Sequence, residues 1–267
     1  MTTETQTGYF QHNGGRLYFE TAGQGEPVVF VHGFTLDTRM WDDQWQPFAD
    51  AGYQVIRYDV RGFGRSSDPE GAYANQEDLK ALLDHLGAER PHVVGLSMGG
   101  QIALDYAVTY PEAMRSLVLI DSALGGHTWT PAFRPGVLGL ADIAQRDGVA
   151  MALEVWMNND LFAAARANAC APRLAEIVTQ YRGYRWLQND PVLSLEPPAA
   201  TILDRISAPT LAMVGEHDLP DFHNIAGYVA EHAPNARKVV VPGAGHMANM
   251  EAPEQVNQLI FEFLATR

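Results

Sequence analysis

The pentapeptide Gly95-Leu96-Ser97-Met98-Gly99 constrains the fold of this chain more than any other segment. It directly follows the apolar run 91–94 and leads into the helix-like segment 101–107. A serine with a glycine two positions away on each side can make the sharp strand-to-helix turn that holds its Oγ clear of the backbone. Strand and helix cross so closely at such a turn that side chains in place of the glycines would clash. The setting predicts Ser97 as a nucleophile at the end of a buried strand.

A base and an acid that could activate Ser97 follow it in the sequence. A serine hydroxyl is a poor nucleophile until a base removes its proton, and a third group must orient that base. The segment 208–215 is expected to be a buried strand, and Asp218 lies just past its carboxyl end. The segment 237–241 is expected to be another strand, and a glycine-rich turn then leads to His246. Because parallel α/β sheets place their sites at the carboxyl ends of strands, we predict a triad of these three residues.

The acid of this triad has two competitors in the sequence. Glu216 stands two residues before Asp218, and Asp121 follows the strand-like run 117–120. One carboxylate must reach Nδ1 of His246 to fix its tautomer and to steady the imidazolium. We assign this role to Asp218 and keep Asp121 open as an acid that could arrive from another loop.

With these residues the chain resembles the α/β-hydrolase fold family over nearly its whole length. Its order of nucleophile, acid and base is the order of that family and differs from the trypsin-like and subtilisin-like orders. Further motifs that carry the resemblance are His32-Gly33-Phe34 after the strand 28–31, the segment 59–66 after the strand 54–58, and Gly245-His246-Met247. Residues 96–100 and 246–254 look most like esterases grouped with 3-oxoadipate enol-lactonases. The resemblance implies a cofactor-free serine hydrolase.

Attack on an acyl carbon builds an oxyanion that needs two backbone N–H donors held in place. Met98, the residue after the nucleophile, is expected to give one, and Phe34 is expected to give the other. His32 and the segment 59–66 are interpreted as structural elements that brace the loops beside the site. No metal or other cofactor is expected, because the other histidines show no spacing suited to metal ligation.

Apolar runs alternate with amphipathic stretches along most of the chain. Residues 9–12 and 16–21 are expected to form an antiparallel hairpin, because Asn13-Gly14 supplies the positive φ angles of a tight turn. Further strands are expected near Val28, Val55, Val93, Val118, Thr210 and Val239, and helices over 75–86, 100–110, 222–232 and 253–264. Such alternation implies crossover helices and a parallel sheet buried on both faces. The predicted fold class is α/β, an eight-stranded, mostly parallel sheet flanked by helices.

The alternation stops between residues 124 and 200, where helical patches at 142–158 and 171–186 replace strand-like runs. Gly125-Gly126 and Pro197-Pro198 bracket this segment, as suits the two ends of an insertion. We predict a helical cap over 124–200, inserted between core segments 1–123 and 201–267. Aromatic residues of the cap are expected to line the substrate pocket, namely Trp129, Trp156, Tyr184 and Trp186. Arg182 or Arg185 could point inward and bind a substrate carboxylate.

Composition narrows the partners and the cellular location. At 267 residues and 46% apolar content, the chain can bury a full core as one domain with an insertion. The net charge of −14 argues against a nucleic-acid partner, since phosphate binding needs clustered Lys and Arg. Cys170 is the only cysteine, which excludes an intrachain disulfide and suits a reducing compartment. The polar start of the sequence and the absence of long apolar runs predict a soluble cytoplasmic protein without a membrane partner.

The predicted function is hydrolysis of a small carboxylic ester or lactone through an acyl-enzyme on Ser97. Two other functions of the same fold stay open. Family members that hydrolyse carbon–carbon bonds share the Ser-Met-Gly-Gly run, but they usually place an aromatic residue where this chain has Met247. A ligand receptor or signalling protein could keep the triad and bind without turnover. Dehalogenases and epoxide hydrolases of this fold are excluded, because they carry an aspartate at the position of Ser97.

Overall fold

The computed structural model of the chain describes residues 4–131, 133, 137 and 139–266. Eight strands form one sheet in the order β1-β2-β4-β3-β5-β6-β7-β8. The pairs β1/β2 and β2/β4 are antiparallel, and the other neighbouring pairs are parallel. The strands are β1 (Gln6–His12), β2 (Gly15–Ala22), β3 (Pro27–Val31), β4 (Gln54–Tyr58), β5 (His92–Leu96), β6 (Ser116–Ile120), β7 (Thr210–Gly215) and β8 (Ala236–Val241). The predicted eight-stranded, mostly parallel sheet is confirmed.

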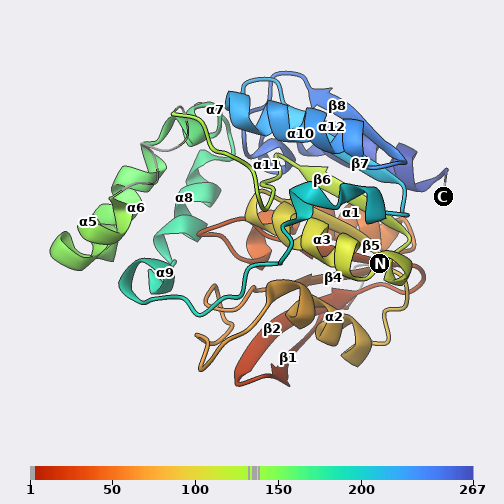
Figure 1. Cartoon of the computed structure of the whole chain (residues 1–267), viewed down its shortest axis with the longest axis horizontal. Helices are drawn as coiled ribbons and strands as arrows, with labels where there is room; N and C mark the ends of the chain where they lie inside the picture. Colours follow the sequence, from red (N-terminus) through yellow and green to blue (C-terminus); the bar gives the residue numbers. More distant parts are fainter. Residues whose placement is uncertain (1–3, 132, 134–136, 138, 267) are drawn as a thin grey trace.

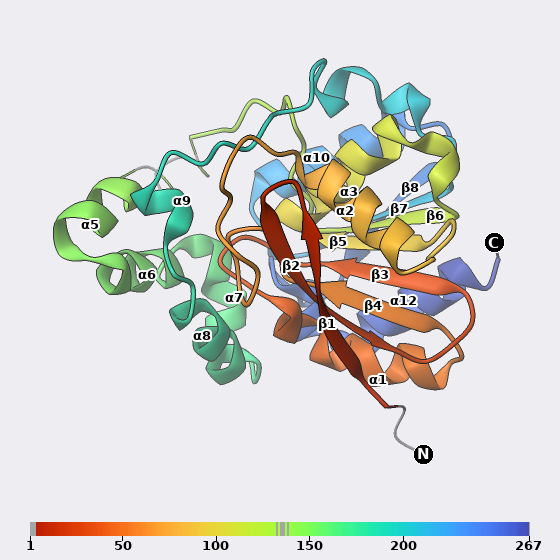
Figure 2. The same cartoon turned by 90° about the horizontal axis from the view of Figure 1, so that it is seen from below.

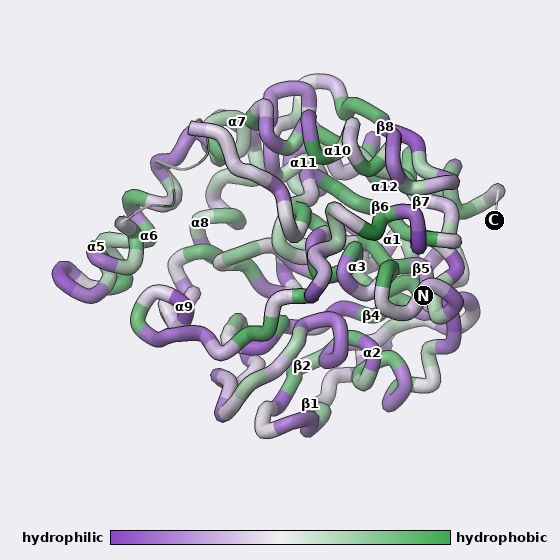
Figure 3. Tube along the Cα trace, in the orientation of Figure 1, coloured by the Kyte–Doolittle hydropathy of each residue, from purple (hydrophilic) through white to green (hydrophobic). Residues whose placement is uncertain are grey.

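Helices cover both faces of this sheet. Figure 2 shows α1 (Asp42–Asp50) and α12 (Pro253–Leu264) on one face, and α2 (Asn75–His85), α3 (Met98–Thr109) and α10 (Pro220–His232) on the other. Every residue of β5, β6 and β7 is buried, and these strands form the hydrophobic centre of the molecule in Figure 3. A strand covered on both faces is apolar along its whole length, which is why short apolar runs marked these strands in the sequence.

Helix α1 is absent from the sequence-based prediction, and Pro47 explains why. Proline inside a helix removes one backbone hydrogen bond, so a polar segment that contains it does not show a helical pattern. The missing N–H of Pro47 leaves the carbonyl of Asp43 without its helical donor, and Asn257 Nδ2 of α12 donates to that oxygen at 2.9 Å. The four helices that were predicted outside the cap agree with the structure to within two residues at each end.

The segment between β6 and β7 contains helices and short 3-10 turns, without a strand among its described residues. Its helices are α5 (Leu140–Asp147), α6 (Val149–Met157), α7 (Ala163–Arg166), α8 (Ala171–Thr179) and α9 (Tyr184–Leu187), grouped to one side of the sheet in Figure 1. The predicted patches 142–158 and 171–186 are each divided by a glycine with positive φ, Gly148 at 95° and Gly183 at 77°. The limits of the cap at 124 and 200 stay a prediction. No helix within the described part of the chain is long and apolar enough to cross a membrane.

A buried ion pair joins the N-terminal hairpin to helix α2. Arg61 Nε and Nη2 donate to the two carboxylate oxygens of Asp78 at 2.8 and 2.6 Å, and both side chains are almost fully buried. The same guanidinium donates to the carbonyls of His12 and Asn13 in the turn between β1 and β2. One buried cation therefore fixes the turn of the hairpin against the helix.

We expect Asp78→Ala to lower the free energy of unfolding by about 3–5 kcal/mol, because it leaves the Arg61 guanidinium buried without a counterion. The measurement is urea unfolding monitored by circular dichroism. Asp84→Ala on the same helix is the matched control, since Asp84 is solvent-exposed and its ion pair with Lys80 is worth at most about 1 kcal/mol. Equal losses in the two variants would contradict the structural role assigned to Arg61.

Candidate active site

Ser97 occupies the turn between β5 and α3 in a strained backbone conformation. Its φ and ψ angles are 55° and −116°, a combination that non-glycine residues rarely adopt. A Cβ atom at Gly95 would lie 2.2 Å from the carbonyl oxygen of Gly99, and one at Gly99 would lie 2.1 Å from the carbonyl oxygen of Val31. Both glycines are therefore required by close backbone contacts. The turn presents the Ser97 hydroxyl at the carboxyl edge of the sheet.

The three residues predicted as a triad form a chain of hydrogen bonds at this edge of the sheet. Ser97 Oγ is 3.0 Å from Nε2 of His246, and Nδ1 of His246 is 2.9 Å from Oδ2 of Asp218. Oδ1 of Asp218 accepts a hydrogen bond from the backbone N–H of Leu219 at 2.7 Å, which holds the carboxylate toward the ring. His246 and Asp218 are buried. The geometry allows His246 to accept the proton of Ser97 while Asp218 holds the ring in one tautomer.

Asp121, the alternative acid, lies beside Asp218 and His246. Its Oδ1 accepts the backbone N–H of Gly215 at 2.7 Å, at the end of β7. The structure thus places Asp218, and not Asp121, at Nδ1 of His246. Glu216 lies away from the ring and accepts the backbone N–H of Gly243 at 2.8 Å.

The loop that carries His246 is held by a residue to which the sequence analysis gave no role. Glu251 accepts the backbone N–H of Gly245 at 2.6 Å and that of Met247 at 3.0 Å, so its carboxylate spans the residues on both sides of His246. Glu251 belongs to the one-turn helix α11 (Ala248–Glu251), which begins two residues after the histidine. An acidic side chain in the first turn of a helix that reaches back to preceding N–H groups is a common capping arrangement, and this signal could have identified it.

Burial dominates the electrostatics of the triad. It lowers the pKa of His246 from 6.5 to about 4, because the imidazolium loses its hydration. It also raises the pKa of the Asp218 carboxyl and that of Asp121 well above the usual range. The imidazole is consequently neutral at pH 7, which is the form that a general base requires.

Two backbone N–H groups beside Ser97 could stabilise an oxyanion. Within the described part of the chain, the N–H groups of Phe34 and Met98 donate to no protein acceptor. The buried ring of His32 accepts the N–H of Val60 on Nε2 at 2.8 Å, and its Nδ1 donates to the carbonyl of Gly33 at 2.8 Å. Because that carbonyl belongs to the same peptide as the N–H of Phe34, the His32 ring orients the donor. The geometry agrees with a bracing role for His32.

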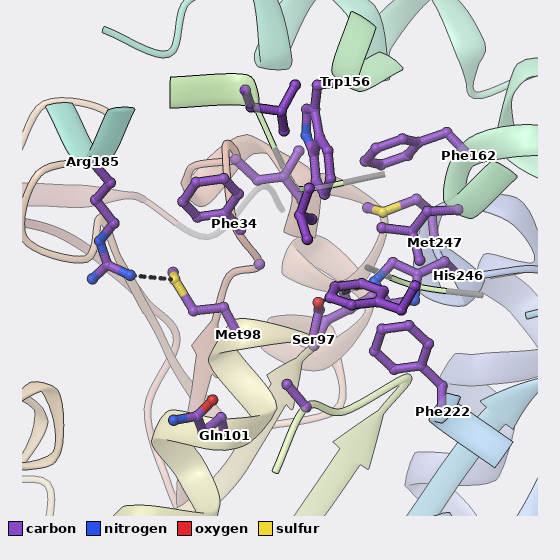
Figure 4. Close-up of a pocket in the computed structure, with 18 of the residues that line it drawn as sticks. Phe34, Ser97, Met98, Gln101, Trp156, Phe162, Arg185, Phe222, His246 and Met247 are labelled. Carbon is purple, nitrogen blue, oxygen red and sulfur yellow. Dashed lines mark hydrogen bonds between the residues drawn. The ribbon is translucent and has the colours of Figure 1, made fainter. Parts of the chain in front are cut away.

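A cavity of about 300 Å³ lies against Ser97 and His246. Its walls include Trp129, Trp156 and Trp186 of the predicted cap, with Phe162 and Phe222 near His246 (Figure 4). Tyr184 was expected to line the same cavity, and that expectation is wrong. Its ring lies against Gly62 instead.

Among the described residues that line this mainly apolar cavity, Arg185 is the one cation. Nη1 of Arg185 donates to Sδ of Met98 at 3.3 Å, as Figure 4 shows, and Nη2 donates to the hydroxyl of Tyr73 at 3.2 Å. Asp190 lies 2.7 Å from Nε of the same guanidinium. Arg182 points away from the cavity and pairs with Asp68 at 2.8 Å. Of the two arginines considered, only Arg185 can meet a bound molecule.

Asp121, Asp218 and His246 are the one group of described residues whose donor atoms lie close enough to suggest a metal site, within 4.8 Å of one another. Nδ1 of His246 is engaged by Asp218, and Oδ1 of Asp121 is engaged by a backbone N–H. The donors therefore face one another and not a common centre, which suits a proton-transfer group better than a cation site.

Comparison with known proteins identifies relatives over almost the full length. A family model described as alpha/beta hydrolase fold matches residues 26–253. A 2-hydroxy-6-oxononadienedioate/2-hydroxy-6-oxononatrienedioate hydrolase of Comamonas testosteroni is 30% identical, over 94% of this chain and 91% of that protein. The solved structure of a thermophilic esterase from Thermogutta terrifontis, with malate bound, is 29% identical with a TM-score of 0.75 and covers 98% of both chains. The enol-lactonase from Burkholderia xenovorans LB400 is 22% identical with a TM-score of 0.81, covers 97% of this chain and 100% of that one, and shares the fold.

The lowered pKa of His246 predicts the pH dependence of activity. His246 can accept a proton only when neutral, so kcat/KM should stay constant through the neutral range and fall only as the pH drops below 6.5 toward about 4. The measurement is kcat/KM for an uncharged ester from pH 4 to pH 8, with circular dichroism at each pH to confirm folding. An acid limb with its midpoint at or above 6.5 would contradict the effect of burial.

Proposed function

The chain belongs to the alpha/beta hydrolase fold family, and on that premise we propose that it is a serine hydrolase that cleaves small carboxylic esters or lactones through an acyl-enzyme on Ser97. The observation that carries the proposal is the chain of hydrogen bonds from Ser97 Oγ through His246 to Asp218, at the wall of a mainly apolar cavity. Nucleophile, base and orienting acid are the groups that acyl transfer needs, and their order of contacts matches those roles.

The reaction would proceed in two steps. Ser97 Oγ attacks the carbonyl carbon while Nε2 of His246 takes the hydroxyl proton, and the carbonyl oxygen becomes an oxyanion that accepts hydrogen bonds from the N–H groups of Phe34 and Met98. The tetrahedral species collapses when the bond to the leaving oxygen breaks and His246 returns the proton to that oxygen. Water, deprotonated by His246, then attacks the acyl-enzyme, and Ser97 regains its proton as the acid leaves.

The cavity limits the size of the acyl group. A volume of about 300 Å³ lies at the lower end of small-molecule pockets, and its walls are mainly aromatic and aliphatic. Trp156 closes the cavity from the cap side, where its Nε1 donates to Oγ1 of Thr35 at 2.8 Å. A short acyl chain suits this space better than a long one.

Arg185 supports a substrate that carries a carboxylate away from the reacting carbonyl. A thioether is a weak acceptor, so the hydrogen bond from Nη1 to Sδ of Met98 leaves most of the donor capacity of that nitrogen unused. A planar guanidinium binds a carboxylate through two parallel hydrogen bonds. The Thermogutta terrifontis esterase was solved with malate, a dicarboxylate, and the Comamonas testosteroni relative is named for a dioate. Both names are consistent with an acidic substrate for this chain.

A carbon–carbon bond hydrolase is the second candidate. The dioate that names the Comamonas testosteroni relative contains no ester bond, so its hydrolysis must break a carbon–carbon bond. Arg185 could hold one carboxylate of such a compound. Met247 stands where carbon–carbon hydrolases usually place an aromatic residue, which favours an ester or lactone. Parallel assays with a short p-nitrophenyl ester, a carboxylated enol-lactone and a 2-hydroxy-6-oxo dienoate separate the two candidates, and a single burst without turnover on all of them would indicate a receptor.

We expect Ser97→Ala to lower kcat for a p-nitrophenyl ester by on the order of 10⁴ or more, because covalent catalysis is lost while the backbone donors remain. Steady-state kinetics on the purified variant measure this. Ser122→Ala is the matched control, since its buried hydroxyl donates to the carbonyl of Ala123 and lies outside the cavity wall. A Ser97→Ala enzyme that kept a tenth of the wild-type turnover would rule out the acyl-enzyme.

The role of Arg185 is tested with a neutral ester and its analogue that carries a terminal carboxylate. We expect Arg185→Ala to lower kcat/KM for the charged ester by about 10–100-fold and to change the neutral ester little, because an unpaired carboxylate in an apolar cavity is costly. Arg182→Ala is the control, since Arg182 pairs with Asp68 outside the cavity. If the wild type and both variants discriminate equally against the charged ester, Arg185 does not bind the carboxylate and the protein is an esterase for neutral substrates.

A further inference from the structure

A second buried carboxylate lies beside the acid of the triad. Asp121 follows β6 and Asp218 follows β7, two neighbouring strands of the sheet, so their side chains meet at its carboxyl edge. Oxygen atoms of the two carboxyl groups and a ring nitrogen of His246 lie within 4.8 Å of one another. Asp121 is completely buried, and Asp218 is 8% exposed. The mechanism above gives Asp121 no task.

The surroundings do not allow both carboxyl groups to be ionised. The charged or titratable groups that face the pair are His246 and Glu251, and Glu251 adds a further negative charge. Among the described residues, no lysine or arginine forms an ion pair with either aspartate, and Asp218 pairs with His246 alone. Two like charges at this separation in a buried site disfavour each other strongly, so that one group keeps its proton. The lowered pKa of His246 excludes the imidazole as the holder of that proton at neutral pH.

We propose that Asp121 is a positioning residue that stays protonated and donates its carboxyl proton to the ionised Asp218, so that the pair holds one negative charge next to His246. This inference rests on the triad of the proposed function.

Hydrogen-bond geometry decides which of the two carries the proton. Asp218 accepts two donors, the N–H of Leu219 at 2.7 Å and Nδ1 of His246 at 2.9 Å, as suits an ionised group. Asp121 accepts the N–H of Gly215 on Oδ1 at 2.7 Å, whereas its Oδ2 accepts the N–H of Ala248 through a long and therefore weak hydrogen bond of 3.4 Å. Oδ2 of Asp121 is therefore the least firmly held of these carboxylate oxygens and the one best placed to carry a hydrogen, and the pKa of this fully buried carboxyl is raised.

In this arrangement Asp121 and Leu219 together hold the carboxylate of Asp218 in place. The carboxyl proton of Asp121 supplies Asp218 with a hydrogen-bond donor from the loop after β6, while the N–H of Leu219 supplies one from the loop after β7. Asp121 itself is held with φ at 47°, a left-handed conformation that a non-glycine residue keeps only where its surroundings fix it. Asp218 thus faces His246 with its negative charge, and a protonated Asp121 adds no further charge that would oppose deprotonation of the imidazolium after each step.

Infrared difference spectroscopy tests the proposal without turnover. At pH 8 the wild type minus Asp121→Asn spectrum should show the C=O stretch of a protonated carboxylic acid. Asp105→Asn is the control, because Asp105 is also buried but its pKa is raised only to about 6. Asp105 is therefore ionised at pH 8, and its replacement should leave the carboxylic acid band in place. Loss of only a carboxylate band in Asp121→Asn overturns the proposal, whatever the outcome of the Ser97→Ala test.

Kinetics give the functional readout. Asn tolerates the left-handed backbone, is neutral and donates through its amide, so Asp121→Asn should keep kcat/KM within about three-fold and leave the acid limb unchanged. Asp121→Leu lacks the donor and should lower kcat by about 10–100-fold at nearly constant KM, with folding checked by circular dichroism. An acid limb displaced by about one pH unit or more to lower pH in Asp121→Asn would mean that the wild-type residue is charged, which also overturns the proposal.

Discussion

The close crossing of strand β5 and helix α3 at Ser97 is the constraint on which the site depends. Glycine is required at three positions of this crossing. A Cβ at Gly95 or Gly99 would collide with backbone atoms, and a Cβ at Gly100 would lie 2.3 Å from Oγ of Ser122. The first turn of α3 can then begin directly at the sheet edge, where the ends of β3, β7 and β8 bring their loops. Ser97, His246, Asp218 and the N–H groups of Phe34 and Met98 gather at this edge because the parallel strands end there.

Phe34 connects this edge to the cap. Its backbone N–H faces the site, while its ring lies 5.6 to 5.9 Å from the rings of Tyr181, Trp156 and Trp186. The side chain is irrelevant to the hydrogen bond that the N–H can make, but it fixes the loop against the helices that close the cavity. The loop that would stabilise the oxyanion and the wall that shapes the substrate space are therefore one packed unit, and movement of the cap would act on both.

Local burial, and not the overall charge of −14, sets the chemistry of the site. The triad histidine is surrounded by the carboxyl groups of Asp121, Asp218 and Glu251, yet desolvation keeps its ring neutral. Across the cavity, Arg185 is the cation that faces the substrate space, and its partner Asp190 lies outside the cavity wall. An acidic protein can thus present guanidinium N–H donors at the cavity wall, while Asp190 balances the charge of the guanidinium from behind.

The sequence by itself determined the sheet, the nucleophile turn and the order of the three candidate catalytic residues, because apolar runs, glycine pairs and strand ends are local signals. Tertiary structure alone decided which carboxylate faces His246, since Asp121 and Asp218 follow neighbouring strands and the sequence carries no measure of their separation. It also decided that Arg185 lines the cavity whereas Arg182 pairs with Asp68 and Tyr184 lies against Gly62. Side-chain direction in a short helix depends on packing against distant segments, and no local pattern encodes it.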